Sequence, residues 1–147
     1  MDGGAGKDTV DYSASARDTT VNLKTGEGGG AAVGDTYQFI ENVVGSQFND
    51  TIWGNAQVNE MNGGAGTDRF FYEQLADISG DTINGFSLAE GDKVDLTRID
   101  DFTMDNISGG GTGGGPFRID YHGGTVYLTV NSSVSGQQLS RLLVFDA

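Results

Sequence analysis

Side chains that carry oxygen recur every nine residues in the middle of this chain. When residues 36–71 are divided into consecutive nonapeptides, the sixth positions are Glu41, Asp50, Asn59 and Asp68. Glycines are frequent in the same units, and glycine accepts positive φ angles at little cost, so a glycine-rich turn can direct several carbonyl groups at one point. Carboxylate and carbonyl oxygens are the ligands that calcium prefers, in sets of about six to eight. The spacing therefore predicts turns that bind a hard divalent cation.

Apolar side chains occupy the eighth position of each of these units: Val43, Ile52, Met61 and Phe70. A period of nine fits neither the 3.6-residue period of a helix nor one long strand. It predicts a coil in which each nonapeptide forms one turn and one short strand, and two nonapeptides complete a lap. The apolar side chains would then point inward between two parallel sheets. Laps would stack at about 4.8 Å, which would bring Asp50 and Asp68 to the same side of the coil.

The best cation site in this arrangement lies between the turns at residues 45–50 and 63–68. Asp50 and Asp68 would supply the charge. Backbone carbonyls would come from the turn glycines, which are Gly45, Gly63, Gly64 and Gly66.

Two units match the pattern G-G-x-G-x-D-x-U-x, in which U is a large apolar residue, at every position. They are GGAGKDTVD at residues 3–11 and GGAGTDRFF at residues 63–71. The pattern resembles the calcium-binding repeat of the RTX (repeats-in-toxin), or haemolysin-type, family. The resemblance implies an all-β fold, a parallel β-roll, in which Ca²⁺ lies between laps and is held by the matching aspartates and turn carbonyls. It carries the ligand role over to the Asp50/Asp68 site and to a set in the first unit, Gly3, Gly4, Gly6 and Asp8.

Other candidate ligands depart from the pattern. Asn59 replaces the aspartate of its unit and Glu41 occupies the frame before it, so we expect a weak or empty site on that side. Asp81 follows Gly63 by eighteen residues and would complete the last site together with Asp68. Asp92 and Asp95 alternate around Val94 and are either a second ligand set or solvated strand residues.

We expect a single domain with a roll at residues 1–105. Residues 12–35 interrupt the repeat in this roll, with a strand expected at 19–23 and a loop at 24–35. Residues 72–105 resemble the region that follows the last repeat in RTX proteins.

The remaining residues, 106–147, are expected to form an antiparallel β cap that closes the open end of the roll. Residues 108–116 are glycine-rich and are expected to form a loop. Alternating apolar residues on both sides of His122-Gly123-Gly124 predict a β-hairpin. Residues 139–145 are either a buried final strand or part of a carboxy-terminal secretion signal.

The charge of the chain favours cation binding and excludes several partners. There are 21 acidic and 8 basic residues, a net charge of −13, and no cysteine. Like charges in a compact fold repel one another, and bound divalent cations would relieve this repulsion. The acidity argues against nucleic acid and anionic membranes as partners. No apolar run approaches membrane-spanning length, so we expect no membrane insertion. The absence of cysteine excludes a disulfide framework and cysteine-based zinc sites.

No catalytic motif stands out. His122 is the only histidine, and G-x-S-x-G, H-E-x-x-H and phosphate-binding sequences do not occur. We expect no enzymatic activity in this chain, and expect any catalysis to belong to a missing upstream domain. Trp53, Phe71 and Tyr72 would suit either a sugar-stacking surface or packing within the repeat.

We therefore expect a monomeric, calcium-binding RTX module that folds when calcium binds outside the cell. The resemblance implies a secreted, extracellular protein of a Gram-negative bacterium, exported by the type I secretion machinery. The repeat beginning directly after Met1 leads us to expect a fragment of a longer protein, whose secretion and stability the module supports. Two alternatives remain open. One is a glycan-binding or enzyme-assisting module that binds a polysaccharide, similar to the modules of alginate epimerases. The other is the carboxy-terminal half of a secreted protease or lipase.

Overall fold

The computed structural model describes residues 1–99, 107–109, 115–121, 124–131 and 143–144. In these residues the chain consists almost entirely of short strands and turns, with one turn of 3₁₀ helix, η1, at Leu75–Asp77. No helix in these residues has the length and apolar character required to cross a bilayer. The expected all-β class is confirmed.

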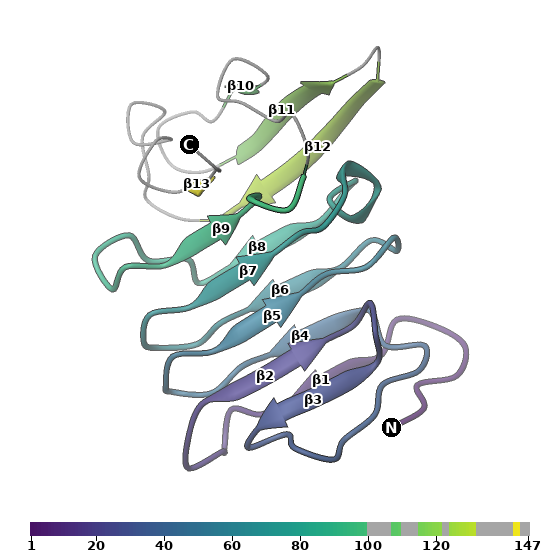
Figure 1. Cartoon of the computed structure of the whole chain (residues 1–147), viewed down its shortest axis with the longest axis vertical. Helices are drawn as coiled ribbons and strands as arrows, with labels where there is room; N and C mark the ends of the chain where they lie inside the picture. Colours follow the sequence, from purple (N-terminus) through teal and green to yellow (C-terminus); the bar gives the residue numbers. More distant parts are fainter. Residues whose placement is uncertain (100–106, 110–114, 122–123, 132–142, 145–147) are drawn as a thin grey trace.

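Successive strands of the roll lie alternately in two parallel sheets that face each other (Figure 1). The first sheet contains four parallel strands of the roll: β1 (Thr9–Asp11), β4 (Asn42–Val44), β6 (Glu60–Asn62) and β8 (Thr82–Asn84). The second contains the strands that alternate with them: β2 (Thr19–Asn22), β5 (Thr51–Trp53), β7 (Arg69–Phe71) and β9 (Lys93–Asp95). This alternation is the arrangement expected of a β-roll.

The core consists of two ladders of apolar side chains, one from each sheet. In the first sheet the paired residues are Val10, Val43, Met61 and Ile83. In the second sheet they are Val21, Ile52, Phe70 and Val94. All eight are at most 4% exposed, and burial of each side chain stabilises the fold by about 1.5–3 kcal/mol. The predicted inward direction of the apolar eighth positions is confirmed.

The lap length changes along the roll. Ile52 pairs with Phe70, eighteen residues later, as the nonapeptide period requires. Met61 pairs with Ile83 after 22 residues, and Phe70 pairs with Val94 after 24 residues. The extra residues lie in the turn that contains η1 and in the turn before β9. The nine-residue count therefore fails to predict the position of residues after β7.

The inserted segment supplies two strands rather than one. Residues 19–22 form the expected strand β2, which continues the second sheet next to β5. The expectation of a loop at 24–35 is wrong in part, because residues 27–30 form strand β3 (Glu27–Gly30), antiparallel to β2. A Cβ at Gly28 would collide with the carbonyl of Ala32. Glycine thus allows the backbone to approach closely here, whereas a run of glycines usually marks a loop.

Strands of the carboxy-terminal part extend both sheets. β12 (Gly124–Val130) pairs in parallel with β8 and antiparallel with β11 (Gly115–Tyr121), which pairs antiparallel with β10 (Ile107–Gly109). β13 (Leu143–Val144) pairs in parallel with β9. Strand β10 and the start of β11 correct the loop expected at 108–116. The hairpin turn at 122–123 and most of residues 139–145 lie outside the described residues, and the role of this part as a cap remains a prediction.

Candidate metal centre

The turns of the roll form two stacked rows, one along each side of the sheets (Figure 1). The first row lies before strands β5, β7 and β9 and comprises residues 45–50, 63–68 and 85–92. The second row lies before strands β1, β4, β6 and β8 and comprises residues 3–8, 36–41, 54–59 and 72–81. Each turn ends on one of the acidic or amide residues that the sequence singled out, and the next strand follows at once.

These terminal residues are linked from lap to lap by one repeated hydrogen bond. In the first row the backbone N–H of Asp50 donates to Oδ1 of Asp68 at 2.9 Å, and the N–H of Asp68 donates to Oδ1 of Asp92 at 2.8 Å. The structure thus brings Asp50 and Asp68 together on one side of the roll.

The second row repeats the bond with different residues. The N–H of Asp8 donates to Oε2 of Glu41 at 3.0 Å, and the N–H of Asn59 donates to Oδ1 of Asp81 at 2.7 Å. One oxygen of each of these carboxylates is therefore already committed to the backbone of the preceding lap. The second oxygen of each carboxylate takes no part in this repeated bond.

The second oxygen divides the turns into two kinds. Oδ2 of Asp8 and Oδ2 of Asp68 are buried and have no hydrogen-bond partner within the described part of the chain. We call their turns, 3–8 and 63–68, the open turns. A buried polar oxygen without a partner costs about 1–3 kcal/mol, so each open turn contains an acceptor that would be stabilised by a cation. They are the same two turns that match the nonapeptide pattern completely.

In the other turns a protein group occupies the second oxygen. Oδ2 of Asp50 accepts from the N–H and Oγ of Ser46, and Oδ2 of Asp92 accepts from the N–H of Ser87 at 2.7 Å. Oδ2 of Asp81 accepts from the hydroxyl of Tyr72 at 3.0 Å. We call 36–41, 45–50, 54–59, 72–81 and 85–92 the closed turns, which include 36–41, where Oε1 of Glu41 accepts from Gln57, and 54–59, where the amide of Asn59 is hydrogen-bonded.

A glycine at the second position explains why two turns are open. Gly4 and Gly64 have φ angles of 81° and 98°, a region in which other residues are strained. In this conformation their N–H groups donate to Oδ1 of Asp2 at 3.1 Å and to Oδ1 of Asn62 at 3.0 Å. Ser46 has no positive φ, and its N–H is directed at Asp50 instead. The residue type at this position thus distinguishes the closed turn 45–50 from the two open turns.

Glycines also bring carbonyl groups of the neighbouring turn close to the open turn 63–68. A Cβ at Gly64 would collide with the carbonyl oxygen of Ser46, and one at Gly66 would lie 2.8 Å from that of Phe48. A Cβ at Gly63 would collide with Oδ2 of Asp68 itself. The groups that converge on this space are oxygens, the ligand type that calcium requires. The residues therefore fit a calcium ion between turns 45–50 and 63–68.

The open turn 3–8 shows the same approach to its neighbour. A Cβ at Gly3 would collide with the carbonyl oxygen of Phe39, and Gly6 adopts a φ of 133°. A second candidate site therefore lies between turns 3–8 and 36–41, with Oδ2 of Asp8 as its free carboxylate oxygen.

The electrostatics of the first row favour a cation. Burial raises the pKa of Asp68 to about 7, and the like charges of Asp92, Asp50 and Glu90 add to the increase. Burial likewise raises the pKa of Asp92 above its usual range. A positive ion beside these carboxylates would reverse the unfavourable interaction, because opposite charges stabilise the ionised form.

The site would rely mainly on the backbone. Nowhere in the described residues do three or more histidine, aspartate or glutamate side chains come close enough together to hold a metal ion. Each open turn offers one free carboxylate oxygen, so most ligands would have to be carbonyl oxygens, as proposed from the glycine content of the turns.

The carboxylate of Asp50 is held by hydrogen bonds from two segments of the chain. Its Oδ1 accepts from the N–H and the hydroxyl of Thr19, at 2.6 and 2.7 Å, while Oδ2 is held by Ser46. Both oxygens of Asp50 therefore accept hydrogen bonds, whereas Oδ2 of Asp68 has no partner among the described residues, and a contribution of Asp50 to calcium binding stays a prediction. Thr19 belongs to the inserted strand β2, so no count of the nonapeptides could have placed it there.

The longer laps change the position of one predicted ligand, Asp81, and the structure also places Asp92 and Asp95. Asp81 lies in the second row beside Asn59, and it does not complete a site with Asp68. Asp92 takes that place beside Asp68. Asp95 is 2% exposed and pairs with Arg69 at 2.8 Å, so it is neither a solvated residue nor part of a turn.

The sequence predicts a weak or empty cation site beside Glu41 and Asn59, which lie in the second row of turns. Oε2 of Glu41 accepts from Asp8, and Oε1 accepts from Nε2 of Gln57 at 3.0 Å. Nδ2 of Asn59 donates to the carbonyl of Glu41 at 3.2 Å. The turn 54–59 is therefore filled by hydrogen bonds between protein groups.

Comparison with known proteins agrees with this geometry. Residues 36–70 match the RTX calcium-binding nonapeptide repeat, in four copies. The matched segment includes turns 36–41, 45–50 and 54–59 and the open turn 63–68. A search of curated proteins finds no significant match. With its alternating parallel strands and its glycine-lined open turn, the chain contains a segment of RTX calcium-binding nonapeptide repeats at residues 36–70.

Proposed function

We propose that this chain is a calcium-binding module that takes up calcium at its two open turns, 3–8 and 63–68. The observation that carries the proposal is the buried Oδ2 of Asp68, which has no partner in the described residues and lies among glycines and carbonyl groups. Asp8 offers the same kind of oxygen in the other open turn. Gly63, Gly64 and Gly66 allow the close approach of the laps that a shared ion requires.

Calcium would act on folding through mass action. A ligand that binds only the folded chain stabilises it by an amount that grows with ligand concentration. Extracellular calcium modules have dissociation constants of about 10⁻⁴–10⁻³ M, so external calcium would fill such sites and cytosolic calcium would not. The net charge of −13 opposes compaction when the ions are absent. The module would therefore gain most of its stability outside the cell.

We further propose that the module belongs to a larger secreted protein. RTX repeats are typical of extracellular bacterial proteins, and export by the type I machinery would deliver an incompletely folded chain into high calcium. The module itself would be non-enzymatic, and any protease, lipase or other activity would lie in another segment of the parent protein.

Glycan binding is the weaker alternative. The rings of Trp53 and Phe71 stack on each other with centroids 4.6 Å apart and an interplanar angle of 9°. The guanidinium of Arg69 lies 5.3 Å from the centroid of the Phe71 ring, and Tyr72 is fully buried. The stacking of Trp53 on Phe71 and the burial of Tyr72 support the structural role of the aromatic residues.

A calcium titration followed by far-UV circular dichroism tests the proposal. After chelation, calcium in the range of about 0.1–1 mM should increase the β signal of the wild-type chain, and magnesium should not. Asp68→Asn should weaken the response, whereas Glu27→Gln, the same charge change on an exposed side chain of β3, should leave it intact. A wild-type chain that is fully folded in chelator and does not respond to calcium would overturn the proposal.

A further inference from the structure

One closed turn, 54–59, carries an amide where the open turns carry a carboxylate. We propose that this turn is a calcium-independent seam in the second row, in which the amide of Asn59 and the ammonium of Lys24 make the contacts that a bound ion would otherwise make. The proposal rests on the proposed function of the open turns. It identifies the part of the roll that does not bind calcium.

The amide group of Asn59 stands among oxygen atoms. Its Nδ2 donates to the carbonyl oxygen of Glu41 at 3.2 Å and to Oδ1 of Asn55 at 3.1 Å, while its Oδ1 accepts from the N–H of Asn55 at 2.8 Å. Asn59 is 1% exposed. The nitrogen thus donates one N–H to the neighbouring turn, at Glu41, and the other to its own turn, at Asn55. An ion at this position would have to displace a buried donor that is already satisfied.

The backbone of the same turn is closed as well. Asn55 occupies the second position, where the open turns have glycine, and it has no positive φ. The side chain of Asn55 also donates from Nδ2 to the carbonyl of Leu23 in the inserted segment, at 3.4 Å. The seam is therefore linked to the insertion by hydrogen bonds.

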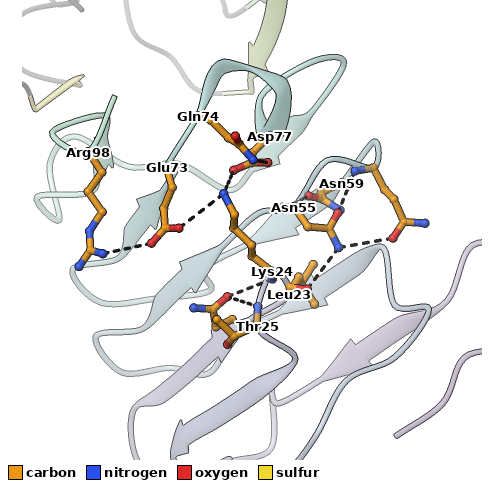
Figure 2. A network of polar contacts seen from close by, with 11 residues as sticks. Leu23, Lys24, Thr25, Asn55, Asn59, Glu73, Gln74, Asp77 and Arg98 are labelled. Carbon is orange, nitrogen blue, oxygen red and sulfur yellow. Dashed lines mark hydrogen bonds and ion pairs between the residues drawn. The ribbon is translucent and has the colours of Figure 1, made fainter. Parts of the chain in front are cut away.

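Lys24 extends this seam to the next lap. Its ammonium lies 2.7 Å from Oδ2 of Asp77 and 3.5 Å from Oε2 of Glu73 (Figure 2). The Asp77 side chain is 1% exposed, and Gln74 donates to its other oxygen at 3.2 Å. Arg98 pairs with Glu73 at 3.1 Å at the rim. The buried charge of Asp77 is thus balanced by a protein cation rather than by a metal ion.

The position of Lys24 is set by a hydrogen-bonded turn between β2 and β3. Oδ1 of Asn22 accepts from the N–H of Lys24 at 3.0 Å and from the N–H of Thr25 at 2.9 Å. Gly26 closes the turn with a φ of 76° and an N–H bond to the carbonyl of Asn22 at 2.9 Å. Figure 2 shows the Lys24 side chain running from this turn toward Asp77. The insertion therefore provides the cation that spans the second row.

Asn59→Asp tests the amide by gain of function. The substitution replaces the donor nitrogen by an oxygen that faces the carbonyl of Glu41 and Oδ1 of Asn55, and a calcium ion between these three oxygens would relieve their repulsion. Isothermal titration calorimetry with calcium chloride should find two ions in the wild-type chain and three in this variant. Ala14→Asp adds the same charge at an exposed position between β1 and β2, outside both rows of turns, and should remain at two. A variant that folds only with calcium, and then binds three ions, also supports the proposal.

Asn59→Ser is the complementary variant, since it removes the amide without adding charge. It should still bind two ions. Loss of one ion in this variant would show that calcium uses Asn59 and would overturn the seam, while the calcium function would stand. Absence of calcium binding by the wild-type chain would instead overturn the proposed function. If Asn59→Asp binds only two ions, this result would also contradict the proposed seam.

Lys24→Met tests the protein cation. With saturating calcium it should lower the thermal midpoint by several degrees without changing the number of bound ions, because Asp77 is left buried and unpaired. Adding Asp77→Asn should restore most of the loss, since both charges are then removed. An unchanged midpoint in Lys24→Met, or a double variant no more stable than the single one, would show that the ion pair does not hold the seam.

Discussion

Asp68 combines properties that rarely occur together in one side chain. It is 1% exposed, its Oδ1 accepts one backbone hydrogen bond, and its Oδ2 has no partner among the residues described. The pKa of about 7 follows from this burial and from the nearby carboxylates. Such a residue destabilises the calcium-free fold and stabilises the calcium-bound one. This opposition is what makes a single side chain able to couple calcium to folding.

Substitution of Asp68 should separate these two effects. We expect Asp68→Asn to weaken calcium binding at this turn by about tenfold or more, on the order of 1.4 kcal/mol, because the site loses its free carboxylate. The calcium-free fold should not become less stable, since the amide carries no charge to bury. Calorimetric titration and urea denaturation in chelator would measure both. A variant with wild-type affinity would remove Asp68 from the ligand set.

The raised pKa of Asp68 predicts a dependence on pH. The folded chain holds the proton of Asp68 up to about pH 7, whereas the ordinary carboxyl pKa is 3.8. This group therefore favours the calcium-free fold below about pH 4, and the contribution is lost as the pH rises to about 7.

Calcium binding should follow the opposite trend, because the ion must displace that proton. We expect the apparent affinity to fall by up to about tenfold per pH unit below pH 7 and to level off above it. Titrations at pH 5, 6, 7 and 8 would show this. In Asp68→Asn the dependence should be smaller, because this variant lacks the carboxyl group that must lose its proton. An affinity that is independent of pH would contradict the assignment of the raised pKa.

At the scale of the elements, the turns differ while the strands do not. Strands β4 to β7 are all three residues long with a buried central side chain. The open turn 63–68 and the closed turn 45–50 connect the same two sheets in the same direction. They differ at the second position, where Gly64 has a positive φ and Ser46 does not. The fold therefore keeps its core period while calcium binding varies from turn to turn.

Gly64→Ala should close or break the open turn. The backbone strain of a side chain at positive φ costs about 1–2 kcal/mol, and the new Cβ would also collide with the carbonyl of Ser46. We expect lower stability and weaker calcium binding. Gly34→Ala is the matched control, because Gly34 has a φ of 88° but no atom within 4 Å of the added carbon. Urea denaturation with calcium should show a clearly larger loss for Gly64→Ala, and equal losses would mean that the approach to Ser46 is unimportant.

At the scale of the whole molecule, the charge and the number of open turns determine how calcium acts. The net charge of −13 is borne by a chain of 147 residues, and two buried carboxylate oxygens lack protein partners in the described part. One open turn lies before β1 and the other before β7. Calcium at both open turns would therefore stabilise the amino-terminal lap and the middle of the roll.

The stability of the chain should reveal the number of ions. Above the dissociation constant, each tenfold rise in free calcium adds about 1.4 kcal/mol per site, so two sites predict about 2.8 kcal/mol. Urea denaturation at several free calcium concentrations, at constant ionic strength, gives this slope. A slope near zero would mean that the folded chain does not bind calcium preferentially. A slope of about 1.4 kcal/mol per tenfold rise in free calcium would show that only one open turn is filled.

Much of this molecule could be predicted from local sequence. The apolar eighth positions predicted the inward ladders, and the complete patterns at 3–11 and 63–71 coincide with the two open turns. Both features depend on a few neighbouring residues. Alternation along a short strand sets which side chain is buried, and the φ angle of Gly4 or Gly64 sets where one N–H points. Such properties require no knowledge of the distant chain.

Only the tertiary structure decided which residues meet across laps. The pairing of Asp68 with Asp92, of Asp81 with Asn59 and of Arg69 with Asp95 depends on how many residues each turn accommodates. The length of one turn plus its strand departs from nine after Phe71, where η1 and the turn before β9 lengthen the laps. The contacts of Thr19 with Asp50 and of Lys24 with Asp77 come from an insertion whose strand joins the second sheet. Contacts across laps depend on register, which the nine-residue period sets only where the repeat is uninterrupted.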